Sequence, residues 1–192
     1  MVARRTSDFA QEQTAKRFRC FDYTATRRVG IQLHNIWRKM KIEIDDLSRL
    51  EVHSLLQEHL ESMQQLSPLE SVHALDLHKL RKPDITFWSA WEPPLLLGCG
   101  ALKELNTKHG EIKSMRTPAA RRRQGAGRAI LAHIMQTAKQ RSYELLSLET
   151  GSAAEFRPAH RLYESSGFVR CGPFGDYSED SNSVFMSLRL AG

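Results

Sequence analysis

The sequence predicts one mixed α/β domain with a largely antiparallel sheet that contains a locally parallel pair of strands. Its 192 residues are enough for one ordinary domain core and too few for two. Hydrophobic residues make up 41% and charged residues 26%, which is typical of a folded globular chain. In the last third of the chain strand and helix patterns alternate, and this order requires a crossover between parallel neighbours.

The first predicted strand covers Lys41–Asp45, where apolar and polar residues alternate. Ser48 and Glu51 then have the spacing of a capping box, and apolar residues recur at helical intervals as far as Met63. This pattern predicts a helix of about four turns. Residues 67–83 are mixed in character and are expected to form a short helix or a loop.

Three strand patterns follow, separated by short turns. Asp84–Trp91 is rich in β-forming residues, and Glu92-Pro93-Pro94 turns the chain into a second strand at Leu95–Leu102. His109-Gly110 is predicted to turn the chain again, into a third strand at Glu111–Thr117. These three strands are expected to be antiparallel neighbours in the sheet.

The last part of the chain is predicted to alternate between helices and strands. One helix pattern places Ile130, Ile134 and Ala138 on a single apolar face. A later helix is closed by Gly167, because glycine suits the left-handed conformation at a helix end. The predicted elements are helices at Gly125–Arg141 and Glu155–Ser166, and strands at Tyr143–Glu149, Phe168–Cys171 and Val184–Leu190.

The positive charge of the chain is concentrated at its N-terminal end. The net charge is +6, and residues 1–39 hold nine Lys and Arg residues and three acidic residues, whereas the rest holds 19 of each sign. Residues 1–39 are predicted to be a basic, flexible extension, or an overlong start for which Met40 is the working initiator; an Arg-rich mitochondrial presequence is a third interpretation. The folded domain is predicted to span residues 40–192. Because this domain has no net charge, no nucleic-acid partner is expected, and a nucleic-acid-associated protein that uses the basic extension is the alternative.

Several sequence patterns bear on the location of the protein. No apolar run approaches the roughly 18 residues that span a bilayer, so no membrane partner is expected. The first residues also lack the pattern of a secretory signal. Cys20, Cys99 and Cys171 lie far apart and are odd in number, which fits a reducing compartment. Together these observations predict a cytoplasmic protein.

The segment Glu111–Arg128 combines a strand, a glycine-containing loop and the start of a helix. Helix N-termini expose unpaired N–H groups and a partial positive charge, and Gly125 and Gly127 would let an anion approach the backbone closely. Four arginines surround these glycines: Arg121, Arg122, Arg123 and Arg128. The pattern predicts an anion site that suits a pyrophosphate.

Two motifs resemble those of one known family. The segment Arg122–Gly127, RRQGAG, resembles the acetyl-CoA signature R/Q-x-x-G-x-G/A of the GNAT superfamily of N-acetyltransferases. Downstream, Ala159–Phe168, AHRLYESSGF, resembles the late motif A-x-x-L-Y-x-x-x-G-F of that superfamily at every specified position. The resemblance covers about Lys41–Leu190. It departs from the family at Phe156, where many members carry an asparagine that touches the cofactor.

The resemblance implies an acetyl-CoA-dependent N-acetyltransferase, similar to the small bacterial members of broad or unassigned substrate. Its implied fold is a three-layer sandwich in which helices flank a splayed, centrally parallel sheet. The implied reaction is direct attack of a primary amine on the acetyl thioester, with acetyl-CoA as co-substrate and no metal. The expected acceptor is a small-molecule amine or amino acid, with a protein lysine or N-terminus, or a non-catalytic CoA-binding module, as alternatives. A homodimer is a further option within the family.

The resemblance also implies which residues handle protons. Tyr163 is the implied general acid that protonates the departing CoA sulfur; a core tyrosine packed with Phe156 and Ala159 is the alternative. Glu111 is the implied general base, because it stands at the head of the motif strand. An exposed strand-end carboxylate is the other interpretation of Glu111, and Glu149 is then the substitute base.

Cofactor contacts follow from the same resemblance. Main-chain groups of Met115 and Thr117 are expected to pair with the pantetheine arm. A free N–H near them, at a bulge that splays the sheet, would stabilise the carbonyl oxygen as charge develops. The residues implied to hold the pyrophosphate are Arg122, Arg123, Gln124, Gly125, Ala126, Gly127 and Arg128.

The remaining polar residues say less about function. The spacings of four histidines match no metal-ligand pattern, so no metal is expected and these histidines are predicted at the surface. They are His53, His59, His73 and His78. The acidic segment Asp176–Asp180 is expected to be a solvated loop, with a face for a cationic acceptor as the alternative.

Overall fold

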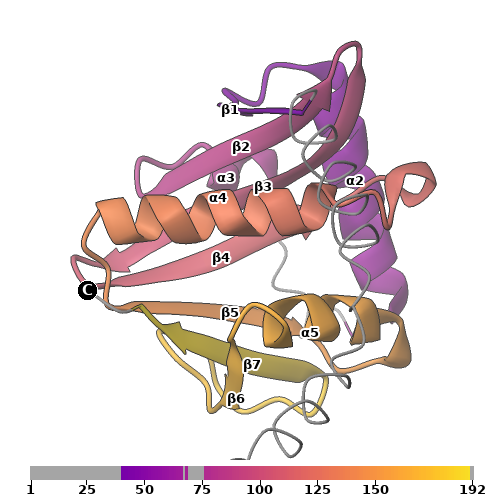
Figure 1. The fold of residues 1–192 in the computed structure, drawn as a ribbon. Helices are drawn as coiled ribbons and strands as arrows, with labels where there is room; N and C mark the ends of the chain where they lie inside the picture. The colour runs from indigo at the N-terminus through magenta and orange to yellow at the C-terminus, as the bar shows by residue number, and fades with distance from the viewer. Residues whose placement is uncertain (1–39, 67, 69–75, 191–192) are drawn as a thin grey trace, which may run out of the picture. The chain divides into compact units, whose positions relative to one another are not determined.

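The structure is a computed structural model that describes residues 40–66, 68 and 76–190 (Figure 1). The predicted extension at residues 1–39 lies outside this part. In the described part seven strands form one sheet in the order β1-β2-β3-β4-β5-β7-β6. The strands are β1 Lys41–Ile44, β2 Ile85–Glu92, β3 Leu95–Asn106, β4 His109–Arg116, β5 Leu145–Gly151, β6 Val169–Cys171 and β7 Ser183–Arg189. β4 and β5 are parallel and the other pairs antiparallel, which confirms the predicted mixed sheet.

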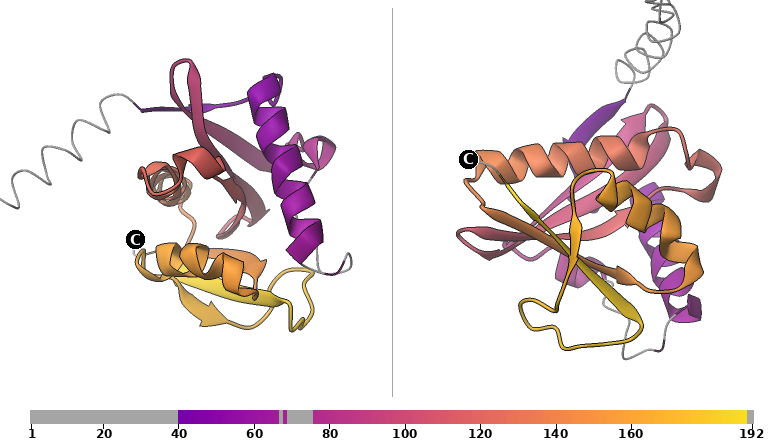
Figure 2. Two further views of the ribbon diagram at one scale, coloured as in Figure 1. Left: turned by 90° about the vertical axis from the view of Figure 1, so that its right-hand side faces the viewer. Right: turned by 60° about the horizontal axis from the view of Figure 1, so that its bottom comes forward.

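Helices cover both faces of this sheet. The described helices are α2 Leu50–Leu66, α3 Leu77–Leu80, α4 Ala126–Gln140 and α5 Arg157–Glu164, with 3₁₀ turns η2 Ala119–Arg121 and η3 Ala154–Phe156. α2 lies on one face, and α4 and α5 lie on the other (Figure 2). None of these helices is long and apolar enough to span a membrane. The predicted three-layer sandwich is confirmed.

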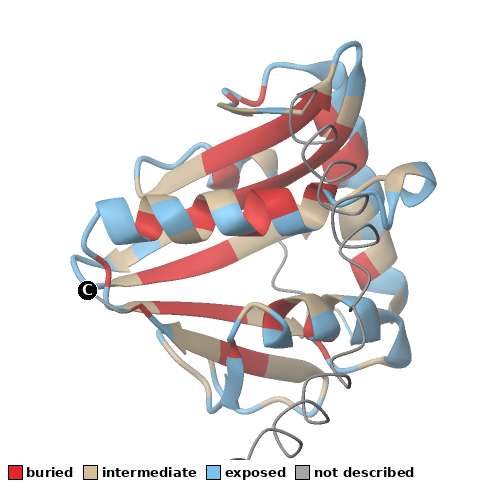
Figure 3. Ribbon diagram, in the orientation of Figure 1, coloured by how far each residue is buried: buried red, intermediate tan, exposed pale blue. Residues whose placement is uncertain are grey.

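Neighbouring residues of the central strands fill two separate cores. Phe87 of β2 and Ala101 of β3 pack with α2, whereas Trp88 and Leu102 pack with α4. This division follows from the strand geometry, since successive side chains point to opposite faces of a sheet. Figure 3 shows the buried residues running along β2, β3, β4 and β5 between the helical layers.

α4 forms because its apolar residues repeat at helical spacing. Ile130, Ile134 and Ala138 are fully buried on one face, as the sequence predicts. Burial of a large aliphatic side chain stabilises a fold by about 1.5–3 kcal/mol. Gly125 and Arg141 are the N-cap and C-cap residues, so the predicted helix agrees with the observed one to within a residue at each end.

Two predicted boundaries are wrong. The predicted turn at His109-Gly110 lies inside β4, and the chain turns earlier, where Lys108 N donates to Asn106 Oδ1 at 2.9 Å. Gly110 is required by packing, because a Cβ there would come within 2.8 Å of the Tyr143 ring. In the predicted helix at Glu155–Ser166, the α-helix α5 begins only at Arg157, after the 3₁₀ turn η3, and Pro158, which has no N–H, lies in its first turn.

Candidate active site

β4 and β5 are joined over only part of their length. Their parallel ladder pairs His109–Ile112 with Leu145–Leu148 and then stops. Beyond this point β4 continues along β3, whereas β5 continues along β7. The two strands therefore separate, and Figure 1 shows the opening between them. Lys113 and Glu149 are the first residues past the last pair, and we call this position the fork.

A β-bulge bends β4 immediately beyond the fork. In the β3–β4 ladder Cys99 pairs with Arg116 and Ala101 with Lys113, so β4 has one residue more than β3 between these pairs. Ser114 has a φ of 52°, in the left-handed region. A bulge of this kind removes backbone groups from the ladder and bends the strand. The predicted splay of the sheet lies at this position.

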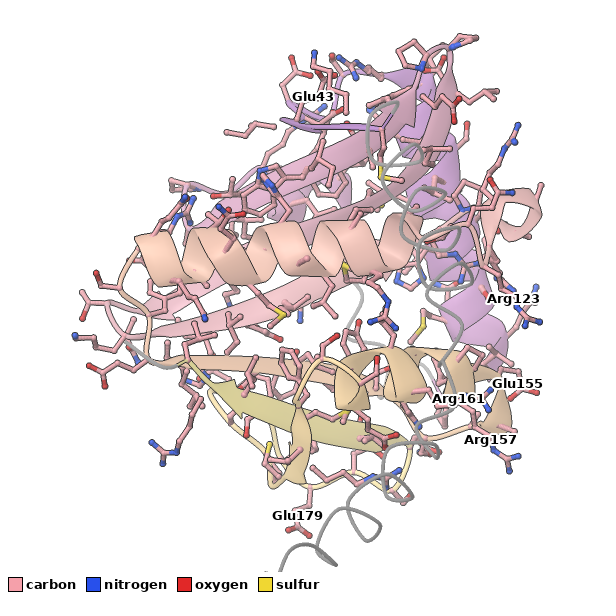
Figure 4. The ribbon with its side chains drawn as sticks, in the orientation of Figure 1. Glu43, Arg123, Glu155, Arg157, Arg161 and Glu179 are labelled. Atoms are coloured by element: carbon pink, nitrogen blue, oxygen red, sulfur yellow. The ribbon has the colours of Figure 1, made fainter. Side chains whose placement is uncertain are left out.

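The loop between β4 and α4 presents the start of the helix without a side-chain cap. Gly125 is the N-cap residue of α4 with a φ of 91°, and no described side chain bonds to this terminus. A Cβ at Gly125 would meet no atom within 4 Å, so the space beside it is open. Arg122 and Arg123 are exposed in the loop, and Arg123 lies toward the same end of the sheet as Arg157 and Arg161 of α5 (Figure 4). Arg122 and Arg123 add positive charge to that of the helix dipole.

Three elements meet at the start of α4. A Cβ at Gly127 would lie 3.6 Å from both Thr117 Oγ1, at the end of β4, and Leu162 Cδ2, on α5. Arg128 Nη2 donates to Ser165 Oγ at 3.3 Å, which ties α4 to the end of α5. The helix start is therefore held against both sides of the fork.

The other residues predicted to bind the cofactor differ in exposure. Ala126 is buried, so only its backbone can face a ligand. Gln124 is exposed, and its Nε2 donates to Ala120 O of the same loop at 3.3 Å. Met115 is half-buried and packs against the core on the α4 side. The side chains of these residues therefore offer a ligand less than their backbone does.

Tyr163 lies on the core-facing side of α5. It is 6% exposed, and its ring packs edge-on against Phe168 with centroids 5.8 Å apart. Burial raises the pKa of Tyr163, and the nearby Glu149 carboxylate raises it further. The phenol therefore stays protonated at neutral pH and can donate a hydrogen bond or a proton.

Glu111 belongs to a buried polar cluster. Its side chain is 2% exposed, so the interpretation as an exposed strand-end carboxylate is wrong. Glu111 Oε1 accepts hydrogen bonds from Lys113 Nζ at 2.8 Å and from Tyr177 Oη at 2.6 Å. Lys113 Nζ also donates to Tyr177 Oη at 2.6 Å. Burial raises the pKa of Tyr177, and Glu111 adds to this effect, so Tyr177 remains a donor.

Glu149 stands on the other arm of the fork, on β5. It is half-buried, and its Oε1 accepts a hydrogen bond from Ser183 Oγ at 2.7 Å. Its charge contributes to the raised pKa values of both Tyr163 and Tyr177, so both phenols lie within electrostatic range of it. The structure thus places Glu149 within electrostatic range of Tyr163, whereas Glu111 lies on the paired part of β4, two residues before Lys113.

Sequence reasoning missed several polar residues of this region. The spacing of Glu111 and Lys113 is the available signal, because residues two apart on a strand share a face. Tyr177 is 66 residues from Glu111 in sequence, and no local pattern reveals that contact. His59 was expected at the surface, and this is wrong, because the residue is half-buried and its Nδ1 is buried.

The departure from the family motif has a structural counterpart. Phe156, the departure from the family motif, covers the end of β5, where any side chain at Gly151 would collide with its ring. No group of three or more His, Cys, Asp or Glu residues that could hold a metal occurs in the described part of the chain. His73 lies outside that part.

Sequence comparison identifies relatives over most of the chain. The sequence profile of the acetyltransferase (GNAT) family matches residues 49–168. The uncharacterized N-acetyltransferase YsnE of Bacillus subtilis is 62% identical over 151 residues, which cover 79% of this chain and 100% of YsnE. The similarity therefore extends over the whole length of YsnE, the shorter of the two proteins.

Solved structures share the fold. The proposed acyl-CoA N-acyltransferase of Klebsiella pneumoniae is 26% identical with a TM-score of 0.64, over 79% of this chain and 98% of that one. A Bacillus subtilis acetyltransferase in complex with CoA has a TM-score of 0.57 over 80% of this chain and 100% of that one. The latter is 17% identical, so its likeness concerns the fold.

Proposed function

The chain belongs to the acetyltransferase (GNAT) family, and from this premise we propose that it transfers an acetyl group from acetyl-CoA to the primary amine of a small molecule or amino acid. Family membership makes it an acyltransferase and argues against a non-catalytic CoA-binding module. We assign the activity to the predicted domain at residues 40–192. The observation that supports the proposal most is the open, arginine-flanked start of α4 beside the fork.

The residues at the start of α4 fit a pyrophosphate. The first N–H groups of a helix have no partner within the helix and carry partial positive charge. Gly125 leaves the approach to these groups open, and Arg122 and Arg123 are exposed beside it. We assign the pyrophosphate to residues 122–128. We assign the pantetheine arm to the backbone of Met115 and Thr117, beyond the fork, as the family motif implies.

The proposed reaction needs a site that stabilises charge on oxygen. Bound acetyl-CoA supplies an activated acetyl thioester. The acceptor nitrogen forms a bond with the acetyl carbon while the carbon–sulfur bond breaks. Backbone N–H groups that the bulge at Ser114 removes from the ladder donate to the carbonyl oxygen as negative charge develops there. Tyr163 gives a proton to the departing sulfur and recovers it from solvent.

The acceptor nitrogen must also lose a proton. Glu149 is half-buried at the fork, whereas the Oε1 atom of Glu111 is enclosed by Lys113 and Tyr177. We therefore propose that Glu149 takes the proton, directly or through a water molecule, and that Glu111 orients Lys113 and Tyr177. This order reverses the preference drawn from the family motif, in which Glu111 came first.

Calorimetric titration of the full chain with acetyl-CoA is the first test. We expect a Kd on the order of micromolar. Acetyl transfer to a panel of primary amines is then measured as release of free CoA thiol. A folded protein that does not bind acetyl-CoA would contradict the cofactor site. Binding without thiol release for any amine of the panel would contradict the proposed transfer.

A further inference from the structure

Three polar side-chain atoms near the bulge of β4 are buried without a hydrogen-bond partner. In residues 40–66, 68 and 76–190, the atoms in this state are His59 Nδ1, Ser114 Oγ and Arg116 Nε. An unsatisfied buried polar group costs about 1–3 kcal/mol. Native proteins seldom keep such groups without a reason, and a ligand that supplies the missing partners is one such reason.

The side chains of His59 and Arg116 lie close together, between α2 and β4. Arg116 Nη2 donates to Glu58 Oε1 at 3.1 Å, and His59 is the next residue of α2. Burial lowers the pKa of His59 to about 4, and the charge of Arg116 contributes to this shift. Ser114 precedes Arg116 by two residues, and its carbonyl oxygen accepts a hydrogen bond from Cys99 Sγ at 3.5 Å. Cys99 in turn pairs with Arg116 in the β3–β4 ladder.

This region adjoins the fork. Arg116 is the residue after Met115, whose backbone we assign to the pantetheine arm. Lys113, the β4 residue of the fork, is also cationic, and its side chain is 9% exposed. A group bound at Arg116 therefore lies next to the position at which the acceptor amine must react.

The chemistry of the three atoms points to an anion. A guanidinium N–H can only donate a hydrogen bond, and a hydroxyl and a neutral imidazole nitrogen can also donate. A carboxylate offers two oxygens that accept several hydrogen bonds and balances the charge of Arg116. Glu58 does not fill this role, because it contacts Nη2 alone and its side chain is 52% exposed.

We propose that the acceptor is a small amine that also carries a carboxylate, and that Arg116 Nε, Ser114 Oγ and His59 Nδ1 bind this carboxylate. The inference rests on the proposed function, because it concerns the acceptor of that reaction. In an amino acid the two groups are separated by one carbon atom, so its carboxylate can sit at Arg116 while its amine faces the fork. A polycationic amine would instead meet the positive charges of Arg116 and Lys113.

The test compares each common α-amino acid with its carboxamide as an acceptor for the full-length protein at saturating acetyl-CoA. Each pair differs only in the carboxylate. For the best amino acid we expect kcat/KM at least about tenfold above that of its amide. In Arg116→Gln this ratio should fall to about one. Arg116→Lys keeps the charge and loses the planar set of N–H donors, so its ratio should lie between those of the wild type and Arg116→Gln.

Glu58→Gln separates binding from a structural role. If Arg116 serves only its ion pair with Glu58, then Glu58→Gln will reproduce the effect of Arg116→Gln. If Arg116 binds the carboxylate, Glu58→Gln frees the guanidinium and the preference for the amino acid is kept or increased. Arg170→Gln, at an exposed arginine of β6, is the control for loss of one positive charge. It should leave the ratio unchanged.

A binding measurement keeps this inference distinct from the proposed function. The CoA-loaded protein is titrated with the same pairs by calorimetry, and thermal unfolding checks that each variant folds. If Arg116→Gln does not fold, Arg116→Lys carries the comparison. Equal binding of every amino acid and its amide, or a preference that survives the Arg116 substitutions, overturns the inference. If no amine is acetylated, the proposed function fails, yet amino-acid binding that is lost with Arg116 still supports the carboxylate site.

Discussion

Lys113 Nζ lies 2.8 Å from Glu111 Oε1, and the side chains of both residues are almost fully buried. Burial removes the water that would hydrate the two charges, and a buried pair is stable only when further hydrogen bonds satisfy it. Tyr177 supplies them, since its hydroxyl donates to Glu111 and accepts from Lys113. The pair therefore fixes the loop between β6 and β7 onto β4 at the fork.

Loss of one partner of this pair should destabilise the fold. Lys113→Met leaves the Glu111 carboxylate buried without a cation, and we expect the free energy of unfolding to fall by about 3–5 kcal/mol. The double variant Lys113→Met/Glu111→Gln removes the charge as well and should recover more than half of this loss. Urea unfolding of the full chain measures both effects.

Lys108→Met is the matched control. Lys108 and Glu144 form an ion pair at 2.9 Å whose side chains are 60% and 69% exposed. Such exposed pairs contribute at most about 1 kcal/mol. Equal costs for Lys113→Met and Lys108→Met, or a double variant in which the two effects simply add, would contradict the view that burial makes the Lys113 pair important.

Sequence patterns predict those elements of the fold that are determined by residues close together in the sequence. α4 follows from Ile130, Ile134 and Ala138, which lie within three turns of one helix. The sequence wrongly predicts a turn at Gly110, because the glycine is required there by a residue that is distant in sequence. Its hydrogen atom faces the ring of Tyr143, which only the folded sheet brings near.

The site divides in the same way. The start of α4 could be predicted, because the glycines, the arginines and the helix pattern are adjacent in sequence. The contacts of Glu111 with Tyr177 and of Arg116 with Glu58 join residues 66 and 58 positions apart, so they depend on the path of the chain. The family motifs supply candidate residues at the fork, but they do not reveal that Glu111 is buried against Lys113.

Tyr163→Phe should lower kcat and leave the fold intact. The substitution keeps the ring that packs against Phe168 and removes only the hydroxyl group, the proposed donor to the departing sulfur. General acid catalysis contributes about 10²–10⁴-fold, and we expect a fall in kcat of about 100-fold with little change in KM. Thiol-release kinetics measure both constants.

Tyr143→Phe is the control for loss of a phenol. Tyr143 Oη donates to Glu104 Oε2 at 2.7 Å on β3, away from the assigned cofactor contacts. Its kcat should match that of the wild type. A Tyr163→Phe enzyme with unchanged kcat would make this residue a packing tyrosine and assign protonation of the thiolate to solvent.

The two carboxylates at the fork should give different pH profiles. Glu149→Gln removes the proposed base, and we expect kcat/KM to fall by about 100-fold near neutral pH and to recover at high pH, where the amine is already deprotonated. Glu111→Gln should lower kcat/KM by a constant factor across the same range, because this residue is proposed only to orient Lys113 and Tyr177. The reverse assignment of the two profiles would return the role of base to Glu111.

Gly125→Asp should weaken acetyl-CoA binding. The residue has a φ of 91° and open space around its Cβ position, so an aspartate would place a carboxylate beside the proposed pyrophosphate site. We expect the affinity to fall more than about tenfold, measured by calorimetry. Gly125→Asn is the matched control, because asparagine tolerates the left-handed conformation and is similar in size without the charge. Equal losses in the two variants would indicate a steric effect and would argue against an anion at this position.

His59 should make the fold less stable in acid. Burial lowers the pKa of His59 from its ordinary value of 6.5 to about 4. Between these pH values the unfolded chain binds a proton that the folded chain does not, so stability falls as the pH is lowered from 6.5 to 4. Relative to His59→Gln, the wild type should lose up to about 3 kcal/mol of unfolding free energy between pH 7 and pH 4.

Urea unfolding at a series of pH values tests this prediction for His59, with His78→Gln, at a histidine of α3, as the control. Parallel curves for the wild type and His59→Gln would mean that the imidazole is hydrated in the native protein. The buried, unpartnered Nδ1 on which the carboxylate site partly rests would then lose its support.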